Sequence, residues 1–128
     1  LALCTLWSLA AFLIVAFGLG SNQPLRMPTP RFLAANTGRV LDAGSGSGRS
    51  SLMVLQARSG VRLVALDKFA QGFGIAGNEE ARLLANLKAA GVADRAEIVS
   101  ADMRDMPLQD QSFDGVVSAF AIDHLGAG

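Results

Sequence analysis

Residues 40–52, V-L-D-A-G-S-G-S-G-R-S-S-L, constrain the fold of this chain more than any other stretch. Two β-forming residues lead into Asp42, glycines stand at positions 44, 46 and 48, and helix-forming residues follow. Glycine accepts positive φ and has no Cβ to obstruct a ligand that approaches the backbone. The first N–H groups of a helix point toward the turn that precedes it. The pattern therefore predicts a strand, a ligand-binding glycine turn and a helix.

Predicted strands alternate with helices along the rest of the chain. Because such alternation produces a parallel sheet with right-handed crossovers, we predict an α/β fold. The last strand carries a near-continuous apolar run, which is typical of a strand covered on both faces. The second helix has Asn78 as its cap and a buried stripe of Leu83, Leu84, Leu87 and Ala90. The predicted strands are 39–43, 61–66, 96–101 and one within 113–122, and the first helix is 48–58.

The spacing of the glycines separates two kinds of cofactor loop. A dinucleotide-binding loop, G-x-G-x-x-G, would place its third glycine at position 49, where this chain has Arg49. Here the third glycine is Gly48, and the stretch resembles motif I of the class I S-adenosylmethionine-dependent methyltransferases, D-x-G-x-G-x-G after two hydrophobic residues. A loop that binds a nicotinamide or flavin cofactor is the first alternative. A glycine turn without any ligand is the second.

The resemblance covers residues 39–125 and implies a Rossmann-like open parallel sheet, partial in this chain, with strand order 3-2-1-4. The stretch F-D-G-V-V-S-A-F-A-I-D-H-L is similar, less specifically, to the small-molecule, UbiE-like branch. The resemblance implies methyl transfer from S-adenosylmethionine to a small-molecule acceptor. An oxidoreductase with a NAD(P) or FAD site, and a module that binds S-adenosylmethionine without catalysis, remain alternatives.

Acidic residues at strand ends are the candidates for binding the cofactor. Asp67 closes the second strand, where a carboxylate can accept both hydrogens of a ribose diol. Carboxylates gathered at one rim repel one another, so we expect a ligand with donor groups between them. In the methyltransferases that the chain resembles, the acid at the position of Asp102 accepts from the adenine amine. The residues implied in cofactor binding are Asp42, Gly44, Gly46, Gly48, Asp67, Lys68, Asp102 and Met103.

Three of these candidates have narrower or competing interpretations. Asp42 corresponds to the acid that reaches the methionine amino group, or it braces the glycine turn. The backbone N–H of Met103 is expected near the adenine ring, and the Lys68 ammonium group is expected in solvent. His124, the only histidine, is a candidate base that takes a proton from the acceptor. His124 could equally be a helix-start residue without chemistry.

Charge and cysteine content exclude several classes of function. The eleven basic and eleven acidic residues cancel, so nothing favours a nucleic-acid partner. Cys4 is the only cysteine, so neither an intrachain disulfide nor a cysteine metal site is predicted.

The N-terminal segment differs from the rest of the chain in composition. Residues 1–19 carry no charge, and as a helix they would extend roughly 28 Å, about one hydrocarbon thickness. We predict a transmembrane helix at 1–20, a linker at 21–38 and a partial methyltransferase domain at 39–128. A secretory signal or a buried helix are the alternatives. Arginines at 26, 31 and 39 favour a single-pass protein with its domain in the cytoplasm. Such an anchor would favour a membrane-associated acceptor. Because the chain begins at Leu1 and stops after four strands, we expect it to be part of a longer protein.

Overall fold

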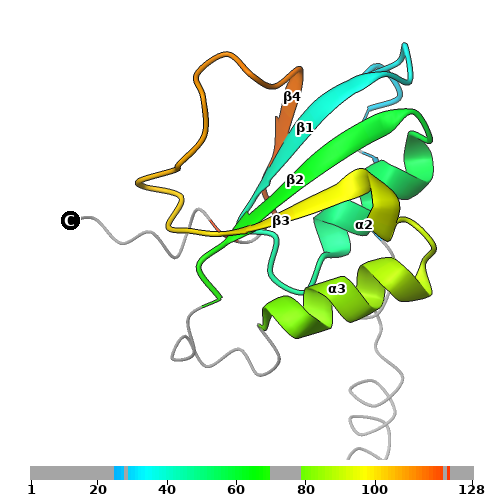
Figure 1. Cartoon of the computed structure of the whole chain (residues 1–128). Helices are drawn as coiled ribbons and strands as arrows, with labels where there is room; N and C mark the ends of the chain where they lie inside the picture. Colours follow the sequence, from blue (N-terminus) through cyan, green and yellow to red (C-terminus); the bar gives the residue numbers. More distant parts are fainter. Residues whose placement is uncertain (1–24, 28, 70–78, 120, 122–128) are drawn as a thin grey trace, which may run out of the picture.

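The computed structural model describes residues 25–27, 29–69, 79–119 and 121 (Figure 1). The predicted membrane helix, Asn78 and His124 lie outside these residues. No helix in the described ranges is long and apolar enough to cross a bilayer. The elements are β1 (Gly38–Ala43), α2 (Arg49–Ala57), β2 (Val61–Asp67), α3 (Glu80–Ala89), the 3-10 turn η1 (Ala93–Arg95), β3 (Ala96–Ser100) and β4 (Gly115–Val117).

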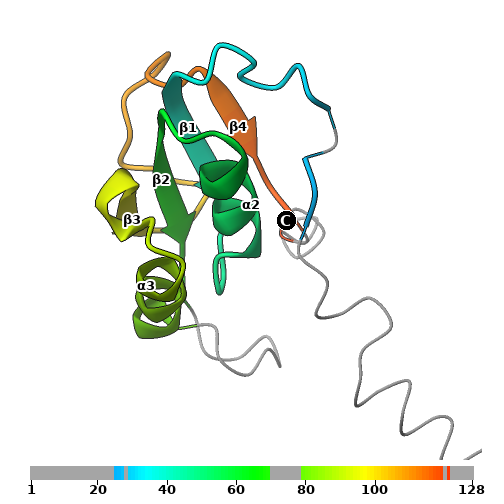
Figure 2. The same cartoon turned by 90° about the vertical axis from the view of Figure 1, so that its right-hand side faces the viewer.

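The four strands form one parallel sheet in the order β3-β2-β1-β4, so the predicted fold class and strand order are confirmed. Asp42 of β1 stands opposite Ala65 of β2 and Val117 of β4. Helices α2 and α3 lie on the same face of the sheet (Figures 1 and 2). Because the strands are parallel, their carboxyl ends meet at one edge, where the glycine turn, Asp67 at the end of β2 and Asp102 after β3 also lie.

Both faces of the sheet bury apolar side chains, because successive residues of a strand point to opposite sides. On the helical face, Val40, Leu63 and Ala65 pack with residues of α2 and α3. On the other face, Leu41, Val64 and Leu66 are covered by the chain that joins β3 to β4, through Ala101, Met103, Leu108 and Phe113.

Two predicted core residues lie at the surface. Leu84 is 38% exposed because a ten-residue helix presents a narrower buried stripe, which Leu83 and Leu87 fill. Val116 is 58% exposed, so the prediction of a last strand covered on both faces is wrong for the described chain. The reason is positional: β4 has three residues and lies at the edge of the sheet, with Val117 on the inner side.

The described part of the predicted linker packs on the domain. Arg58, at the end of α2, donates from Nε to the carbonyl oxygens of Phe32 and Leu33, both at 3.0 Å. Its Nη2 donates to the Pro30 carbonyl oxygen at 2.7 Å. The ring of Phe32 lies so close to Gly115 that a Cβ there would come within 2.8 Å of it. These residues therefore form one wall of the domain rather than a tether.

Candidate cofactor site

The glycine turn after β1 is held by hydrogen bonds from its backbone to the end of β2. The N–H groups of Gly44 and Ser45 both donate to the Leu66 carbonyl oxygen, at 2.8 and 3.1 Å. The φ angles of Gly44, Gly46 and Gly48 are 77°, 51° and 94°, the left-handed region that other residues adopt only with strain. The sequence-predicted glycines are therefore required by the shape of the turn itself.

Neighbouring side chains close on the turn from two directions. A Cβ at Gly48 would lie 2.5 Å from Leu83 Cδ1 in α3, and one at Gly44 would overlap Ala121 and approach Met103 Cε to 2.9 Å. Asn86, also in α3, donates from Nδ2 to the Ser47 carbonyl oxygen at 2.8 Å. Helix α3 therefore fixes the turn, a contact that local sequence spacing does not predict.

Asp42 points away from solvent, toward the first turn of α2. Its carboxylate is fully buried and accepts from Ser50 Oγ at 2.7 and 2.9 Å and from Ser51 Oγ at 2.6 Å. Burial raises the pKa of Asp42, and the hydrogen bonds from Ser51 and Ser50 partly oppose that rise. Of its two predicted roles, this geometry favours bracing the turn. The serines were not among the predicted site residues, although their place at the start of a helix was a signal.

Asp67 connects the end of β2 to the glycine turn. Its Oδ2 accepts from the Gly46 N–H at 2.8 Å, and its Oδ1 accepts from the Phe69 N–H at 2.8 Å. Phe69 has a positive φ of 49°, so the chain turns sharply just after the carboxylate. The acid predicted to bind a ribose is thus half-buried directly beside the glycine turn.

Asp102, after β3, is bound by two cationic side chains. Arg104 donates to it from Nη2 at 2.6 Å, from Nε at 3.0 Å and from its backbone N–H at 2.9 Å. Lys68 Nζ lies 3.3 Å from Asp102 Oδ2, so Lys68 has a partner although its side chain is 56% exposed. The Arg104 side chain and N–H, with Lys68, hold the pKa of Asp102 below its usual range. Arg104 was not predicted, although its spacing of two residues from Asp102 was a signal.

The sequence suggested that the carboxylates at this rim would repel one another. In the structure, donor groups of neighbouring residues compensate for that repulsion. Asp42 has serine hydroxyls, Asp67 has backbone N–H groups and Asp102 has Arg104 and Lys68. Neighbouring residues therefore already supply donors to these three acids, and the expectation of a ligand between them stays a prediction. The fourth acid, Asp123, lies outside the described residues.

Two buried hydroxyls nearby have no hydrogen-bond partner within the described residues. They are Ser45 Oγ, in the glycine turn, and Ser118 Oγ, just after β4. Buried polar groups are normally paired, so both suit a ligand that carries polar groups. Because both lie beside the glycine turn, they fit the amino-acid end of S-adenosylmethionine.

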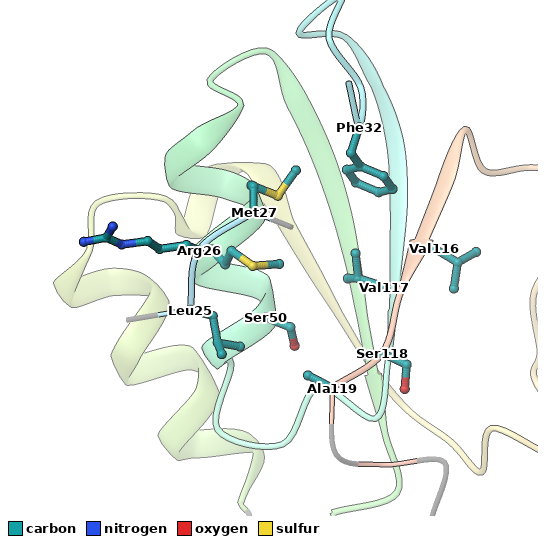
Figure 3. A pocket seen from close by; sticks show the side chains of 10 residues that line it. Leu25, Arg26, Met27, Phe32, Ser50, Val116, Val117, Ser118 and Ala119 are labelled. Carbon is teal, nitrogen blue, oxygen red and sulfur yellow. The ribbon is translucent and has the colours of Figure 1, made fainter. Parts of the chain in front are cut away.

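A cavity of about 520 Å³ lies between the start of α2, the end of β4, residues 25–27 and Phe32 (Figure 3). Val117 and Ala119 point toward Met27 in this view, whereas Val116 and Ser118 point to the other side of the strand. The lining is mostly apolar, and Arg26 and Ser50 are among its polar members.

Comparison with known families defines the class of protein. The model of a methyltransferase domain family matches residues 40–127, a range that includes the glycine turn, Asp67 at the end of β2 and Asp102 after β3. The chain therefore belongs to this family of methyltransferase domains, and its cofactor is S-adenosylmethionine.

A similar protein is the demethylmenaquinone methyltransferase of Clavibacter sepedonicus. It is 37% identical over 108 residues, which are 84% of this chain and 39% of that protein. The chain thus spans about two fifths of that relative's length.

Solved structures share the fold at lower identity. A Methanococcus maripaludis protein assigned to the S-adenosyl-L-methionine-dependent methyltransferases has a TM-score of 0.60 and 22% identity, over 92% of this chain and 46% of that one. An RNA methyltransferase from Salinibacter ruber, in complex with S-adenosyl-L-homocysteine, has a TM-score of 0.52 and 24% identity, over 73% and 60%. At these identities the likeness establishes the fold alone.

Proposed function

We propose that this protein transfers a methyl group from S-adenosylmethionine to a small, apolar acceptor of the quinone type. The observation that carries the proposal is the bond from the Gly46 N–H to Asp67 Oδ2, which joins the glycine turn to the acid at the end of β2. A ligand seated on the turn meets that carboxylate, and a ribose diol supplies the donors that a carboxylate accepts.

The residues of this chain divide the work of holding the cofactor. We assign the amino-acid end to the glycine turn and Ser45, the ribose to Asp67, and the base to Asp102 and the N–H of Met103. The cofactor supplies an activated methyl group, so the protein mainly aligns donor and acceptor and excludes water. Asp42 acts from beneath the turn, because its bonds to Ser50 and Ser51 fix where α2 begins. His124 remains the candidate base for the acceptor.

Two observations support an apolar acceptor. The relative from Clavibacter sepedonicus is a demethylmenaquinone methyltransferase. The cavity beside α2 and β4 is lined mostly by apolar side chains and lies next to the carboxyl ends of β1 and β4. The absence of net charge, with eleven basic and eleven acidic residues, gives no support to a nucleic-acid acceptor.

Methyl transfer to a reduced demethylmenaquinone tests this proposal. Labelled S-adenosylmethionine should pass its methyl group to that acceptor. Filling the cavity with Ala119→Leu should raise KM for the acceptor while the affinity for S-adenosylhomocysteine stays unchanged. Ala85→Leu, the same substitution at an exposed position of α3, is the matched control. Binding without turnover on any acceptor would instead indicate a non-catalytic module.

We also propose that residues 1–20 anchor the domain to the membrane, with the domain in the cytoplasm. The support is the uncharged apolar composition of residues 1–19 and the arginines that follow at 26, 31 and 39. The protein should then stay with membranes after alkaline carbonate washing, and a C-terminal tag should be protected from protease in spheroplasts. Release by carbonate, or a mature N-terminus near Gly20, would contradict the anchor.

A further inference from the structure

Asp67 and Asp102 lie beside each other at the ends of β2 and β3. In the register of these strands Asp67 stands opposite Ser100, and the Ala101 N–H donates to the Asp67 carbonyl oxygen at 3.0 Å. Neighbouring strands are about 4.8 Å apart, so a nucleoside held at Asp67 reaches Asp102 with its base.

The Asp102 carboxylate already has as many donors as it can take. A carboxylate offers about four lone-pair positions, two on each oxygen. Oδ1 accepts from the N–H and the Nε of Arg104, and Oδ2 accepts from Arg104 Nη2 and Lys68 Nζ. A further donor, such as the amine of adenine, can bind there only by displacing one of these four.

We propose that Arg104 competes with the adenine amine of the cofactor for Asp102 and thereby sets the protein's affinity for that cofactor. This inference rests on the proposed function, because it places the cofactor's base at Asp102. Arg104 acts as an affinity-determining residue: its side chain must leave Asp102, at least in part, before the base can be held.

The side chain of Arg104 is the donor group that exchanges. Its backbone N–H belongs to a turn that the Asp105 N–H closes on the Asp102 carbonyl oxygen at 3.0 Å. The Arg104 side chain, in contrast, is 63% exposed and can turn into water. Lys68 is the weaker competitor, since it makes one contact of 3.3 Å where Arg104 holds both oxygens, with 2.6 Å to the nearer one.

Calorimetric titration of the full chain with S-adenosylhomocysteine tests the competition. Arg104→Gln should lower the Kd by about two- to fivefold at low salt, the range expected when an exposed ion pair no longer has to be broken. Raising the ionic strength from about 0.05 M to 0.5 M should lower the wild-type Kd and leave that of Arg104→Gln nearly constant, because salt screens the pair. Arg82→Gln, an exposed arginine of α3, is the control and should behave as wild type.

A double-mutant cycle separates competition from a change in general charge. In the Asp102→Asn background, Arg104→Gln should give no gain in affinity, because the group for which it competes is gone. A Kd of Arg104→Gln that is unchanged or higher than that of the wild type would overturn the inference. A higher Kd would show that Arg104 positions Asp102 for binding. Absence of nucleoside binding by the wild type and all variants would overturn the proposed function as well.

Discussion

At the scale of single residues, Asp67 makes the most specific contribution to the account. It accepts N–H groups from Gly46 and Phe69, each at 2.8 Å, and in our proposal it also holds the ribose. Asp67→Ala should weaken S-adenosylhomocysteine binding by about 5- to 160-fold, since losing hydrogen bonds to a charged group costs about 1–3 kcal/mol. Titration calorimetry measures this, with Asp110→Ala on the exposed loop after β3 as the control. Unchanged affinity would remove the ribose role.

Gly48 provides a second test at this scale, because its strain and its packing can be separated. Its φ is 94°, and a Cβ would lie 2.5 Å from Leu83 Cδ1, whose side chain is fully buried. Gly91 also has a positive φ, 69°, but a Cβ there would meet nothing within 4 Å. Both alanine variants incur the left-handed penalty of roughly 1–2 kcal/mol. Only Gly48→Ala adds overpacking of about 1–3 kcal/mol.

Urea unfolding should therefore show that Gly48→Ala is less stable than Gly91→Ala. Equal losses of stability in the two variants would mean that α3 moves aside easily, and that it does not fix the glycine turn.

At the scale of elements, the start of α2 depends on a buried carboxylate. Burial raises the folded-state pKa of Asp42 above its ordinary value of 3.8. Its contribution to stability is therefore fully present below pH 3.8 and declines as the pH rises through the raised folded-state pKa. The free energy of unfolding of the wild type, minus that of Asp42→Asn, should fall across this window.

Asp102 provides the matched contrast, because its shift has the opposite sign. Its folded-state pKa is lowered from 3.8, mainly by the Arg104 side chain, so its contribution is present above pH 3.8 and lost as the pH falls below it. The free energy of unfolding of the wild type, minus that of Asp102→Asn, should therefore rise with pH. Urea unfolding of both variants over a pH series measures the two slopes, and slopes of the same sign would contradict this assignment.

The elements of the fold were largely predictable from sequence, and the reason is local. Glycine at positions 44, 46 and 48 and the alternation of strands and helices depend on backbone conformation and on which face is buried, which neighbouring residues determine. The bounds of β1 and β2 differ from the predicted ones by one residue.

The features that sequence did not reveal depend on tertiary contacts. Arg95 donates to the carbonyl oxygens of Leu55, Arg58 and Val61, between 34 and 40 residues away, and ties η1 to the end of α2. The exposure of Leu84 and Val116 depends on what covers α3 and β4 in space. Ser50 and Ser51 lie eight and nine residues from Asp42, and Arg104 lies two residues from Asp102, so these partners were within reach of local reasoning. Lys68, 34 residues from Asp102, was not.

At the scale of the whole molecule, the fold determines the cofactor more firmly than the acceptor. The matched family domain contains the glycine turn and both acids. The same fold occurs in an RNA methyltransferase, and the similar protein from Clavibacter sepedonicus is a demethylmenaquinone methyltransferase. The acceptor must therefore be argued from the cavity between α2, β4, residues 25–27 and Phe32, whereas the cofactor follows from the turn itself.

Calorimetric titration of the full chain with S-adenosylhomocysteine, NAD⁺ and FAD distinguishes an S-adenosylmethionine site from a dinucleotide site. The arrangement of Gly44, Gly46 and Gly48 against Asp67, with Arg49 where a dinucleotide loop has its third glycine, predicts saturable one-to-one binding of S-adenosylhomocysteine. It predicts no measurable heat from either dinucleotide. Preferential binding of NAD⁺ or FAD would contradict the account and place the protein among the oxidoreductases.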